Sequence, residues 1–437
     1  MSKIYYGPQT KSALQNFPFS FRKTSRELII CVVQIKKACA IAHGKANDLP
    51  KPTVLAISKA CDEILLGKMN NQFLLPAFQG GAGTSNHMNV NEVIASRATE
   101  ILKFQKQNIL VHPNDHVNLS HSTNDVMHTA LKLTAFGLSH KVINTIQTLI
   151  NSLSKKSGEF KNLPKLGRTH LQDAVPTTLG AEFQAWTEVL KRRLTNLKTA
   201  TNQLLEQNLG GGAIGTSINA SKKYLNLLYK ELQNITQIKV KRAKNLMSQT
   251  GSDGDLLELS QSLTAFCMDL SKIANDLRLL SSGPRGGFSE IILPELQPGS
   301  SMMPGKINPI LPEAINQLYF LVSGNNLTIE HACHASQLEL GAMMPIISDR
   351  IIESLKLSQE VINVFEKKCI KGIKANKAKI KEHLDSSTAY ATLLSPKLGY
   401  NTVTNMVKLA IKNEKSLKET ILDEKLLSEK DFLNLTK

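Results

Sequence analysis

The chain has 437 residues, which is enough for two or three domains and a large buried core. Hydrophobic residues make up 41% of it but aromatic residues only 5%, which favours Leu-, Ile- and Ala-rich helices over a β-sandwich, because strands prefer aromatic and β-branched residues. The net charge of +17 is compatible with nucleic acid, an anionic membrane or small acidic substrates as partners.

The distribution of the lysines narrows this choice. They are spread along the chain apart from one dense cluster, which consists of Lys367, Lys368, Lys371, Lys374, Lys377, Lys379 and Lys381. Few aromatic residues are interleaved with this cluster, so a solvated surface explains it better than nucleic-acid binding does. We therefore expect the positive charge to attract small anions, with no nucleic-acid partner.

The cysteines and the hydropathy indicate the compartment. Six cysteines are scattered without a CxxC pair or a short disulfide framework, so we expect them to be reduced. Residues 1–10 are polar and lack the apolar core of a signal peptide, and no run of about 18 apolar residues occurs. These features predict a soluble, cytoplasmic protein that does not bind membranes.

The first part of the chain predicts two helices and a glycine-rich break. Apolar residues recur at mostly helical spacing over residues 25–42, and a second helical run covers residues 54–66. Residues 79–85, Gln-Gly-Gly-Ala-Gly-Thr-Ser, then interrupt the pattern. The glycines allow backbone N–H groups to approach a ligand closely, or they form a plain turn between two helices.

A second polar segment follows at residues 112–116 and 122–125, His-Pro-Asn-Asp-His and Ser-Thr-Asn-Asp. It is rich in turn and helix-cap residues, and Asp125 is suited to cap the helix that follows. Capping explains one or two of these residues but not all of them. A metal site at His112 and His116 has weak support, since no cysteine or carboxylate cluster joins them.

The third polar segment, residues 167–173, precedes a long amphipathic helix. Its apolar residues recur at steps of three and four over residues 183–209, and three glycines follow at 210–212. A further helix at 256–280 is broken by the glycine-rich residues 283–287.

Residues 283–312 contain five glycines and six prolines, which no continuous helix can accommodate. Within them, Ser300 and Ser301 offer oxygens that can handle a proton, Lys306 offers a positive charge and Asn308 offers amide donors. This set suits an anionic substrate on an active-site loop. A mobile linker with a solvated lysine is the alternative.

Residues 311–341 contain only three charged side chains, Glu313, Glu330 and Glu339. A helix so poor in charge is expected to be buried on most sides, which indicates an oligomer whose long helices share one bundle. His331, Cys333 and His334 lie in this helix, but neighbouring helical positions point in different directions, so we expect no metal site there. After residue 375 the chain becomes lysine-rich, as a small terminal domain would.

Five segments resemble, in the same order, the signature blocks of the fumarase/aspartase superfamily. Residues 299–309, Gly-Ser-Ser-Met-Met-Pro-Gly-Lys-Ile-Asn-Pro, match its GSSxMPxKxNP signature. Residues 80–92, 112–125, 167–180 and 209–219 match its other blocks. The resemblance extends over nearly the whole chain, and agreement of five blocks is highly specific.

The resemblance implies a mainly α fold with a three-domain subunit. The expected domains are an N-terminal helical domain at 1–121, a central long-helix bundle domain at 122–375 with the catalytic loop 283–312, and a small C-terminal helical domain at 376–437. It also implies a homotetramer with a tetrameric 20-helix core, in which each active site is assembled from three chains.

The family reaction removes water, ammonia or an amine from a small dicarboxylate and gives fumarate. Abstraction of the weakly acidic C–H proton yields a carbanion delocalised into a carboxylate, so catalysis needs a base and donors aimed at the new negative charge. By resemblance Ser300 is the base, Lys306 and Asn308 hold carboxylate oxygens, and Ser301 adds a loop contact. Ser300 then needs activation by N–H groups, positive charge and exclusion of water.

The rest of the implied pocket binds the second carboxylate and the leaving group. Its residues would be Thr84, Ser122, Thr123, Asn124, Thr169 and His170. Glu313 falls where the family's glutamate pairs with the motif histidine, so His170 and Glu313 are the expected orienting pair. Arg168 is expected to support the turn. We expect no cofactor and no metal ligand among these residues, and the sequence does not decide whether a divalent metal ion activates the enzyme.

Three features favour ammonia over water as the leaving group. Thr123 follows Ser122 where fumarases usually have a second serine, residues 80–85 read GGAGTS as in aspartases, and residues 293–297 and 311–313 resemble aspartases near the loop. Elimination of ammonia from L-aspartate is therefore the expected activity. Conversion of L-malate to fumarate and water, as in class II fumarases, is the alternative, and Gly305 agrees with fumarase usage.

The chain also departs from the family pattern. His87 replaces a usual asparagine, His128 a usual proline, and Met344 a glutamate that is frequent in aspartases. The first two lie near pocket motifs, so they bear on substrate preference. A non-catalytic structural protein on the same fold is a further alternative, but Ser300, Lys306 and His170 are all present.

Overall fold

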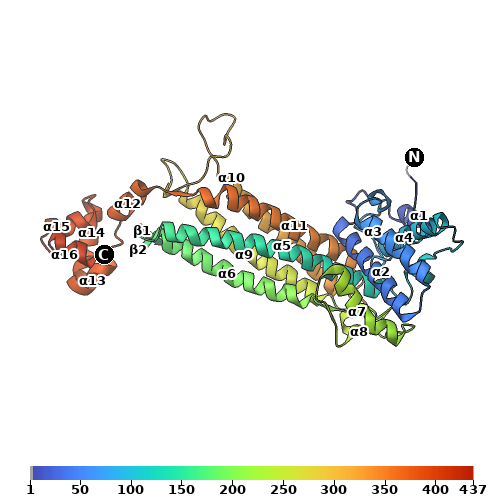
Figure 1. The fold of residues 1–437 in the computed structure, drawn as a ribbon. Coiled ribbons are helices and arrows are strands. Elements are labelled where there is room, and N and C mark those ends of the chain that lie inside the picture. Colours follow the sequence, from blue (N-terminus) through green and yellow to red (C-terminus); the bar gives the residue numbers. More distant parts are fainter. Residues whose placement is uncertain (1–2, 437) are drawn as a thin grey trace. The chain divides into compact units, whose positions relative to one another are not determined.

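The structure, a computed structural model, describes residues 3–436 and is mainly α-helical, as predicted (Figure 1). Its strands form three separate two-stranded sheets in the described residues. The chain divides into two compact units. Unit 1 comprises Met1–Asn144, Thr195–Ala265 and Phe320–Gln359, and unit 2 comprises Thr145–Leu194, Phe266–Tyr319 and Glu360–Lys437. The three-domain division stays a prediction.

In the described residues, unit 1 contains six helices that lie wholly within it. They are α1 (Pro8–Asn16), α2 (Arg26–Ala46), α3 (Lys51–Leu65), α4 (Thr84–Phe104), α7 (Lys222–Thr236) and α8 (Leu246–Gly251), with a 3₁₀ turn at Asn70–Gln72 and a π-helical turn at Pro113–Val117. The strands β3 (Glu206–Gln207) and β4 (Lys241–Arg242) pair in parallel. Helix α2 begins where the Ser25 hydroxyl accepts the Leu28 N–H, and α3, α4 and α7 pack against it.

Unit 2 contains a β-hairpin and the C-terminal helices. The hairpin strands are β1 (Pro164–Thr169) and β2 (Gln172–Thr178), and a second small sheet pairs β5 (Ile291–Ile292) with β6 (Lys374–Ala375). A 3₁₀ turn at Ile370–Gly372 precedes β6. The helices that follow are α12 (Lys377–Ser386), α13 (Ala391–Leu398), α14 (Tyr400–Lys412), α15 (Leu417–Asp423) and α16 (Glu429–Leu435).

Five long helices each contribute residues to both units. They are α5 (Thr123–Glu159), α6 (Leu179–Gln203), α9 (Gly254–Leu280), α10 (Ile310–His334) and α11 (Met344–Lys368). In unit 2, the Asn316 amide of α10 donates to the Ser271 carbonyl and to Asn275 Oδ1 of α9, at 3.1 and 2.9 Å. In unit 1, Lys132 of α5 lies 2.7 Å from the Asp255 carboxylate of α9. Buried polar contacts therefore fix the helix pairs within each unit.

The predicted helix at 183–209 is correct for most of its length but wrong at its end. Helix α6 stops at Gln203, and the backbone then pairs with another segment. The Leu205 carbonyl accepts the Lys241 N–H at 2.8 Å, and the Gln207 carbonyl accepts the Ala243 N–H at 2.9 Å. Leu204 and Leu209 flank β3 and are buried there, so their burial does not come from a continued helix.

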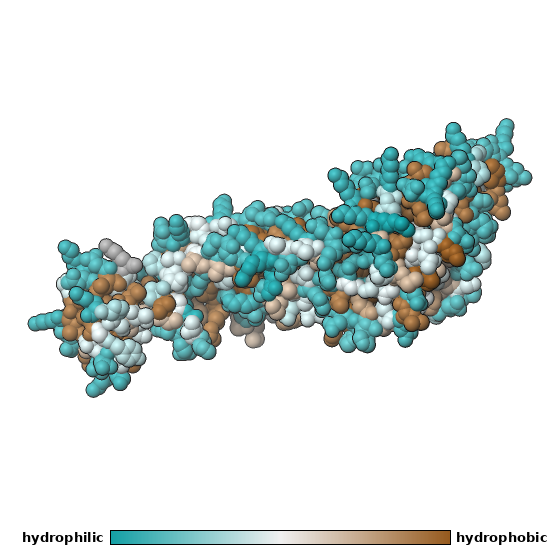
Figure 2. Space-filling model, turned by 90° about the horizontal axis from the view of Figure 1, so that it is seen from below, coloured by the Kyte–Doolittle hydropathy of each residue, from teal (hydrophilic) through white to brown (hydrophobic). Residues whose placement is uncertain are grey.

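Helix α10, for which we expect burial on most sides in an oligomer, carries exposed apolar side chains in the single chain. In unit 1, Phe320 is 63% exposed and Leu327 is 54% exposed. Figure 2 shows one face of the molecule, on which hydrophobic residues appear in small groups among hydrophilic ones.

Among residues 3–436, no helix combines the length and the apolar composition needed to cross a bilayer.

The N-terminus of α1 is capped by a carboxylate from another helix. Glu92 of α4 is buried and accepts hydrogen bonds from the Gly7, Gln9 and Thr10 N–H groups, at 2.8, 2.8 and 3.1 Å, and from the Thr10 hydroxyl at 2.6 Å. The free N–H groups of the first turn need such acceptors, and the positive end of the helix dipole favours a negative charge.

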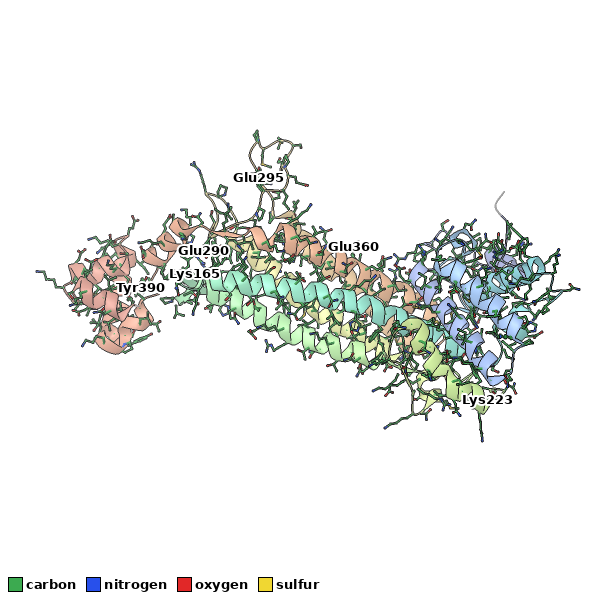
Figure 3. The ribbon with its side chains drawn as sticks, viewed as in Figure 1. Lys165, Lys223, Glu290, Glu295, Glu360 and Tyr390 are labelled. Atoms are coloured by element: carbon green, nitrogen blue, oxygen red, sulfur yellow. The ribbon has the colours of Figure 1, made fainter. Side chains whose placement is uncertain are left out.

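We predict that Glu92→Gln destabilises unit 1 by about 2 kcal/mol or more, because the amide removes one acceptor and the negative charge. The measurements are the midpoint of thermal unfolding and hydrogen exchange at residues 8–16. The matched control is Glu360→Gln, at an exposed glutamate of α11 (Figure 3). Equal midpoints for the two variants would contradict the capping role.

Candidate active site

The 299–309 loop is closed at its neck by hydrogen bonds between its own ends. The Gly299 N–H donates to the Lys306 carbonyl at 2.7 Å, and the Asn308 amide donates to the Gly299 carbonyl at 2.7 Å. Figure 1 shows the segment between α9 and α10 standing clear of both helices. The tip is exposed in the single chain, with Met302 82% exposed. The neck is thus ordered while the tip remains open to a ligand or a second chain.

Ser300 lies inside this loop with its hydroxyl oxygen facing two donors. The Met302 and Met303 N–H groups donate to Ser300 Oγ, at 3.1 and 3.0 Å. Such contacts are common in serine turns, where they only shape the backbone. They also favour negative charge on the oxygen, which is the condition that a serine base requires.

Thr169 and His170 lie at the tip of the β1–β2 hairpin. His170 and Leu171 both have positive φ, at 54° and 62°, as a two-residue hairpin turn requires. Both Thr169 and His170 are exposed on the single chain. The two predicted pocket residues therefore lie on the surface of unit 2.

The buried carboxylate of Glu290 contacts strand β1 of this hairpin. Glu290 is fully buried and lies 2.8 Å from Arg168 Nη2 and 2.9 Å from Lys165 Nζ. Figure 3 shows Lys165 and Glu290 close together. Arg168 also stacks over the Phe288 ring, at 4.3 Å from its centroid. Arg168 is thus held within the protein, in agreement with its expected supporting role.

Charge explains why Glu290 stays ionised. Burial opposes ionisation, but the hydrogen bond from Arg168 and the charge of Lys165 outweigh it and hold the pKa of Glu290 below its ordinary value. His383 of α12 adds a contact of 3.0 Å between its Nδ1 and the Glu290 carboxylate. The hairpin, the segment before β5 and α12 therefore meet at one carboxylate.

In unit 1, Asp125 joins two of the predicted blocks. One of its carboxylate oxygens accepts the Ser122 N–H at 3.0 Å, and the other accepts the Gly210 and Gly212 N–H groups, both at 3.0 Å. Asp125 is fully buried, and burial raises its pKa to about 6, although these hydrogen bonds and the charge of Lys36 oppose the shift. Asp125 thus caps the start of α5, as predicted, and also binds the glycine loop, residues 210–212.

Asn124 makes further contacts to the same glycine loop. Its side-chain amide donates to the Ala213 carbonyl at 2.7 Å, and its own carbonyl accepts the Asn208 amide at 3.2 Å. One of its two amide hydrogens is thereby occupied within the chain. The other hydrogen and the amide oxygen remain as its possible contacts to a ligand.

Within the glycine-rich segment, residues 79–83 form the turn before α4, and residues 84–85 begin that helix. The Thr84 N–H donates to the Gly81 carbonyl at 2.9 Å, and Gly83 has a φ of 88°. The glycines therefore form a turn, and the close approach of their N–H groups to a ligand stays a prediction. Thr84 is exposed at the first position of α4. The first turn carries no acidic side chain, and a helix N-terminus favours anions.

His87 connects this turn to α5. Its Nδ1 lies 2.9 Å from the Thr123 hydroxyl oxygen. Three predicted blocks, residues 80–92, 122–125 and 209–212, therefore come together in unit 1 through side-chain contacts.

Sequence reasoning did not identify Lys36 of α2. It is fully buried, donates to Asn118 Oδ1 at 2.6 Å, and burial lowers its pKa to about 7. Its Nζ lies 3.3 Å from His121 Nδ1, and His121 Nε2 lies 2.8 Å from the Tyr224 hydroxyl. A lysine placed between buried residues at helical spacing, four residues after Val32, was the available signal.

The predicted site residues fall into two sets. Unit 1 holds Thr84, Ser122, Thr123 and Asn124, and unit 2 holds Thr169, His170, Ser300, Ser301, Lys306, Asn308 and Glu313. Within residues 3–436, no hydrogen bond joins His170 to Glu313 in the single chain. The roles of these residues stay predictions.

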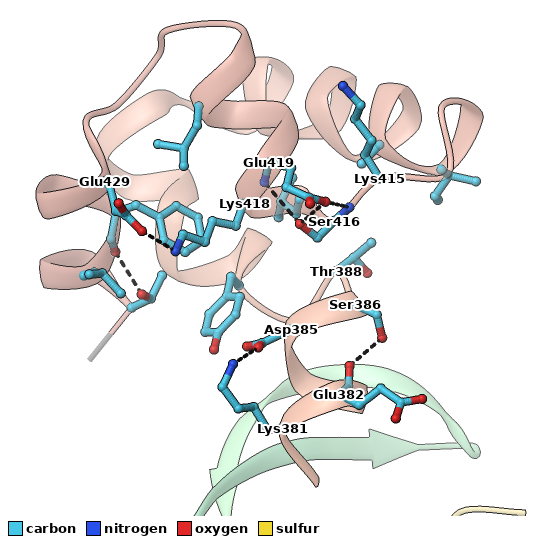
Figure 4. Close-up of a pocket in the computed structure, with 18 of the residues that line it drawn as sticks. Lys381, Glu382, Asp385, Ser386, Thr388, Lys415, Ser416, Lys418, Glu419 and Glu429 are labelled. Atoms are coloured by element: carbon cyan, nitrogen blue, oxygen red, sulfur yellow. Dashed lines mark hydrogen bonds and ion pairs between the residues drawn. The ribbon is translucent and has the colours of Figure 1, made fainter. Parts of the chain in front are cut away.

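Two further features of residues 3–436 bear on where a ligand could bind. In the described part of the chain, no three His, Cys, Asp or Glu side chains are arranged to hold a metal ion, and no disulfide links the cysteines. A pocket of about 1070 Å³ lies among the C-terminal helices and is lined by Lys381 and Lys418. These lysines pair with Asp385 and Glu429, so their charge is already compensated (Figure 4).

Two segments of the chain match known protein families. Residues 2–324 match the family described as lyase, and residues 391–437 match the family described as fumarase C C-terminus. The chain belongs to the fumarase/aspartase superfamily. This confirms the resemblance of the five blocks.

Members of the superfamily with known names match over nearly the full length. The aspartate ammonia-lyase of Bacillus subtilis is 41% identical over 430 residues, which cover 98% of this chain and 90% of that protein. The structure of the fumarate lyase:delta crystallin from Brucella melitensis bound to cobalt has a TM-score of 0.94 at 40% identity, with 99% of this chain and 95% of that chain covered. The recombinant class II fumarase from Schistosoma mansoni has a TM-score of 0.95 at 34% identity, with 100% and 95% covered.

We predict that Glu290→Gln destabilises unit 2 by about 3 kcal/mol, because Arg168 loses its buried counter-charge, whereas Lys165 keeps Glu182 at 2.6 Å. The lowered pKa of Glu290 means that its contribution is present above the ordinary carboxyl pKa of roughly 4 and is lost as the pH falls through the lower folded value. Denaturant unfolding between pH 7 and pH 3 measures both effects.

The matched control for this prediction is Glu295→Gln, at an exposed glutamate of the same segment (Figure 3). Its stability and acid sensitivity should equal those of the unmodified protein. If the Glu290 variant kept the full loss of stability on acidification, Glu290 would not be the group responsible.

Proposed function

We propose that the chain is an aspartate ammonia-lyase, which removes ammonia from L-aspartate to give fumarate. The observation that carries this proposal is the 41% identity to the aspartate ammonia-lyase of Bacillus subtilis across 98% of this chain. The threonine at position 123 and the intact 299–309 loop support it.

In the proposed mechanism Ser300 removes the Cβ proton of L-aspartate. The electron pair of the C–H bond moves into the adjacent carboxylate, where Lys306 and the Asn308 amide stabilise the added charge. The C–N bond then breaks, ammonia leaves, and the double bond of fumarate forms. The two N–H groups on Ser300 Oγ lower the energy of the deprotonated oxygen and thereby support its role as base.

The unit 1 residues are proposed to hold the second carboxylate and the leaving group. Thr84 contributes at the N-terminus of α4, and Ser122, Thr123 and Asn124 contribute at the start of α5. Thr169, His170 and Ser301 are proposed to complete the pocket, and Glu313 to orient His170. No step of this mechanism uses a cofactor.

We propose a cytoplasmic homotetramer with a 20-helix core and a site assembled from three chains. The exposure of Phe320 and Leu327 on α10 supports burial of this helix against other copies. The exposure of Ser301, Lys306 and the hairpin tip on the single chain agrees with a site that other chains complete. We expect no specific binding of nucleic acid.

Fumarate hydratase is the second candidate function. It is favoured by the likeness to the class II fumarase from Schistosoma mansoni, with a TM-score of 0.95, and by Gly305. The two activities share the same carbanion chemistry and differ in the leaving group.

We predict that purified protein forms fumarate from L-aspartate with one ammonia per fumarate. The measurement follows the ultraviolet absorbance of fumarate, with L-aspartate and L-malate offered separately. Fumarate from L-malate alone would replace the proposal by fumarate hydratase. Inactivity with both substrates would reject both functions.

We predict that Ser300→Ala lowers kcat by about 10²–10⁴-fold, since the reaction loses its base. Sedimentation or light scattering should give the same oligomer as for the unmodified protein. Ser154→Ala, at an exposed serine of α5, is the matched control and should keep full activity. A near-normal rate for the Ser300 variant would remove Ser300 from the role of base.

A further inference from the structure

His87 makes a contact for which the family pattern gives no role. It lies in the first turns of α4, is 1% exposed, and its Nδ1 lies 2.9 Å from the Thr123 hydroxyl oxygen. Thr123 begins α5, and Thr84 begins α4 three residues before His87. The contact therefore joins the two helix starts that carry the proposed unit 1 residues.

The imidazole of His87 is neutral. Burial, followed by the nearby charge of Lys36, lowers the pKa of His87 well below its ordinary value. A neutral imidazole has one N–H donor and one bare nitrogen acceptor, so two arrangements of the proton are possible.

The two ring nitrogens have different surroundings. Nδ1 faces Thr123, whereas Nε2 is buried and makes no hydrogen bond within the described residues. A proton on Nε2 would bury a donor without an acceptor, which folded proteins avoid more strictly than an acceptor without a donor. The proton therefore belongs on Nδ1, where it is donated to Thr123 Oγ1.

This choice decides what the Thr123 hydroxyl offers to a ligand. A hydroxyl has one hydrogen to donate and two lone pairs that accept. With the proton on Nδ1, Thr123 accepts from His87 and keeps its own hydrogen free for an anion. With the proton on Nε2, the Thr123 hydroxyl would donate its hydrogen to Nδ1. It would then present only lone pairs to the ligand, and these repel a carboxylate.

We propose that His87 is a positioning residue that holds the Thr123 hydroxyl as a donor to a carboxylate oxygen of the substrate. This rests on the proposed function, because it takes a dicarboxylate as the ligand. His87 does not touch the substrate and acts through Thr123. Since a carboxylate is present both before and after the elimination, the contact stabilises bound substrate and product more than it lowers the barrier.

The first test is a double-mutant cycle between His87→Leu and Thr123→Val. Leucine fills the buried site without a donor, so we expect KM for L-aspartate to rise about five- to tenfold with kcat within about threefold, as the loss of one hydrogen bond predicts. In the Thr123→Val background the same change should have no effect on KM. Additive effects in the cycle, or a fall in kcat with KM unchanged, would overturn the proposal.

Two further variants separate positioning from packing. His87→Asn restores a donor of similar reach, and we expect its KM to lie within about threefold of that of the unmodified protein. His140→Leu, at an exposed histidine of α5, is the matched control and should leave both constants unchanged. An asparagine variant as impaired as the leucine variant would show that only the packing of the ring matters.

The second test does not need activity. Nitrogen NMR of the protein labelled in its histidines, with His87→Asn to assign the signal, reports which ring nitrogen carries the proton. We expect a neutral ring protonated at Nδ1 throughout pH 6–8. A proton on Nε2, or a charged ring, would overturn the proposal even if the protein eliminates ammonia. Absence of turnover with the expected proton position would instead reject the proposed function.

Discussion

The carboxylate of Asp125 is the contact on which the unit 1 part of the site depends. It is removed from water, which is costly for a charge, and three backbone N–H groups replace the lost hydration. Because these donors belong to the start of α5 and to the 210–212 glycines, one side chain fixes two segments that are far apart in the sequence. Only glycine adopts the positive φ of 82° at Gly210 without strain, so the backbone shape that directs this N–H group at Asp125 depends on glycine.

Unit 2 also contains a buried carboxylate that holds segments of the chain together, but here it belongs to a glutamate. Glu290 is also fully buried, but its partners are the cations of Arg168 and Lys165 instead of backbone N–H groups. The predicted site residues Thr123 in unit 1 and His170 in unit 2 are half-buried and exposed, respectively. In each unit a buried carboxylate holds the segment that carries such a residue, namely the start of α5 in unit 1 and the β1–β2 hairpin in unit 2.

Much of this fold follows from the sequence because helical periodicity is a local property. Apolar spacing predicts α2, α3 and α9 with ends close to the observed ones. It fails at residues 204–209, where a strand pair with residues 241–243 replaces the last turns, because that pairing is set by a distant segment. The contact between His87 and Thr123 is equally hidden, since 36 positions separate the two residues. The roles of Ser300 and Lys306 came from the resemblance, because their loop is irregular and lacks any periodic pattern.

The closed neck of the 299–309 loop has a consequence for motion. Gly299, Lys306 and Asn308 bind one another, and the donors to Ser300 Oγ come from Met302 and Met303 within the same loop. The surroundings of the serine oxygen are thus contained in the loop itself. A swing of the whole loop about residues outside the neck would carry this oxygen and its donors together. Movement of the loop as one unit would therefore leave the hydrogen bonds to Ser300 Oγ unchanged.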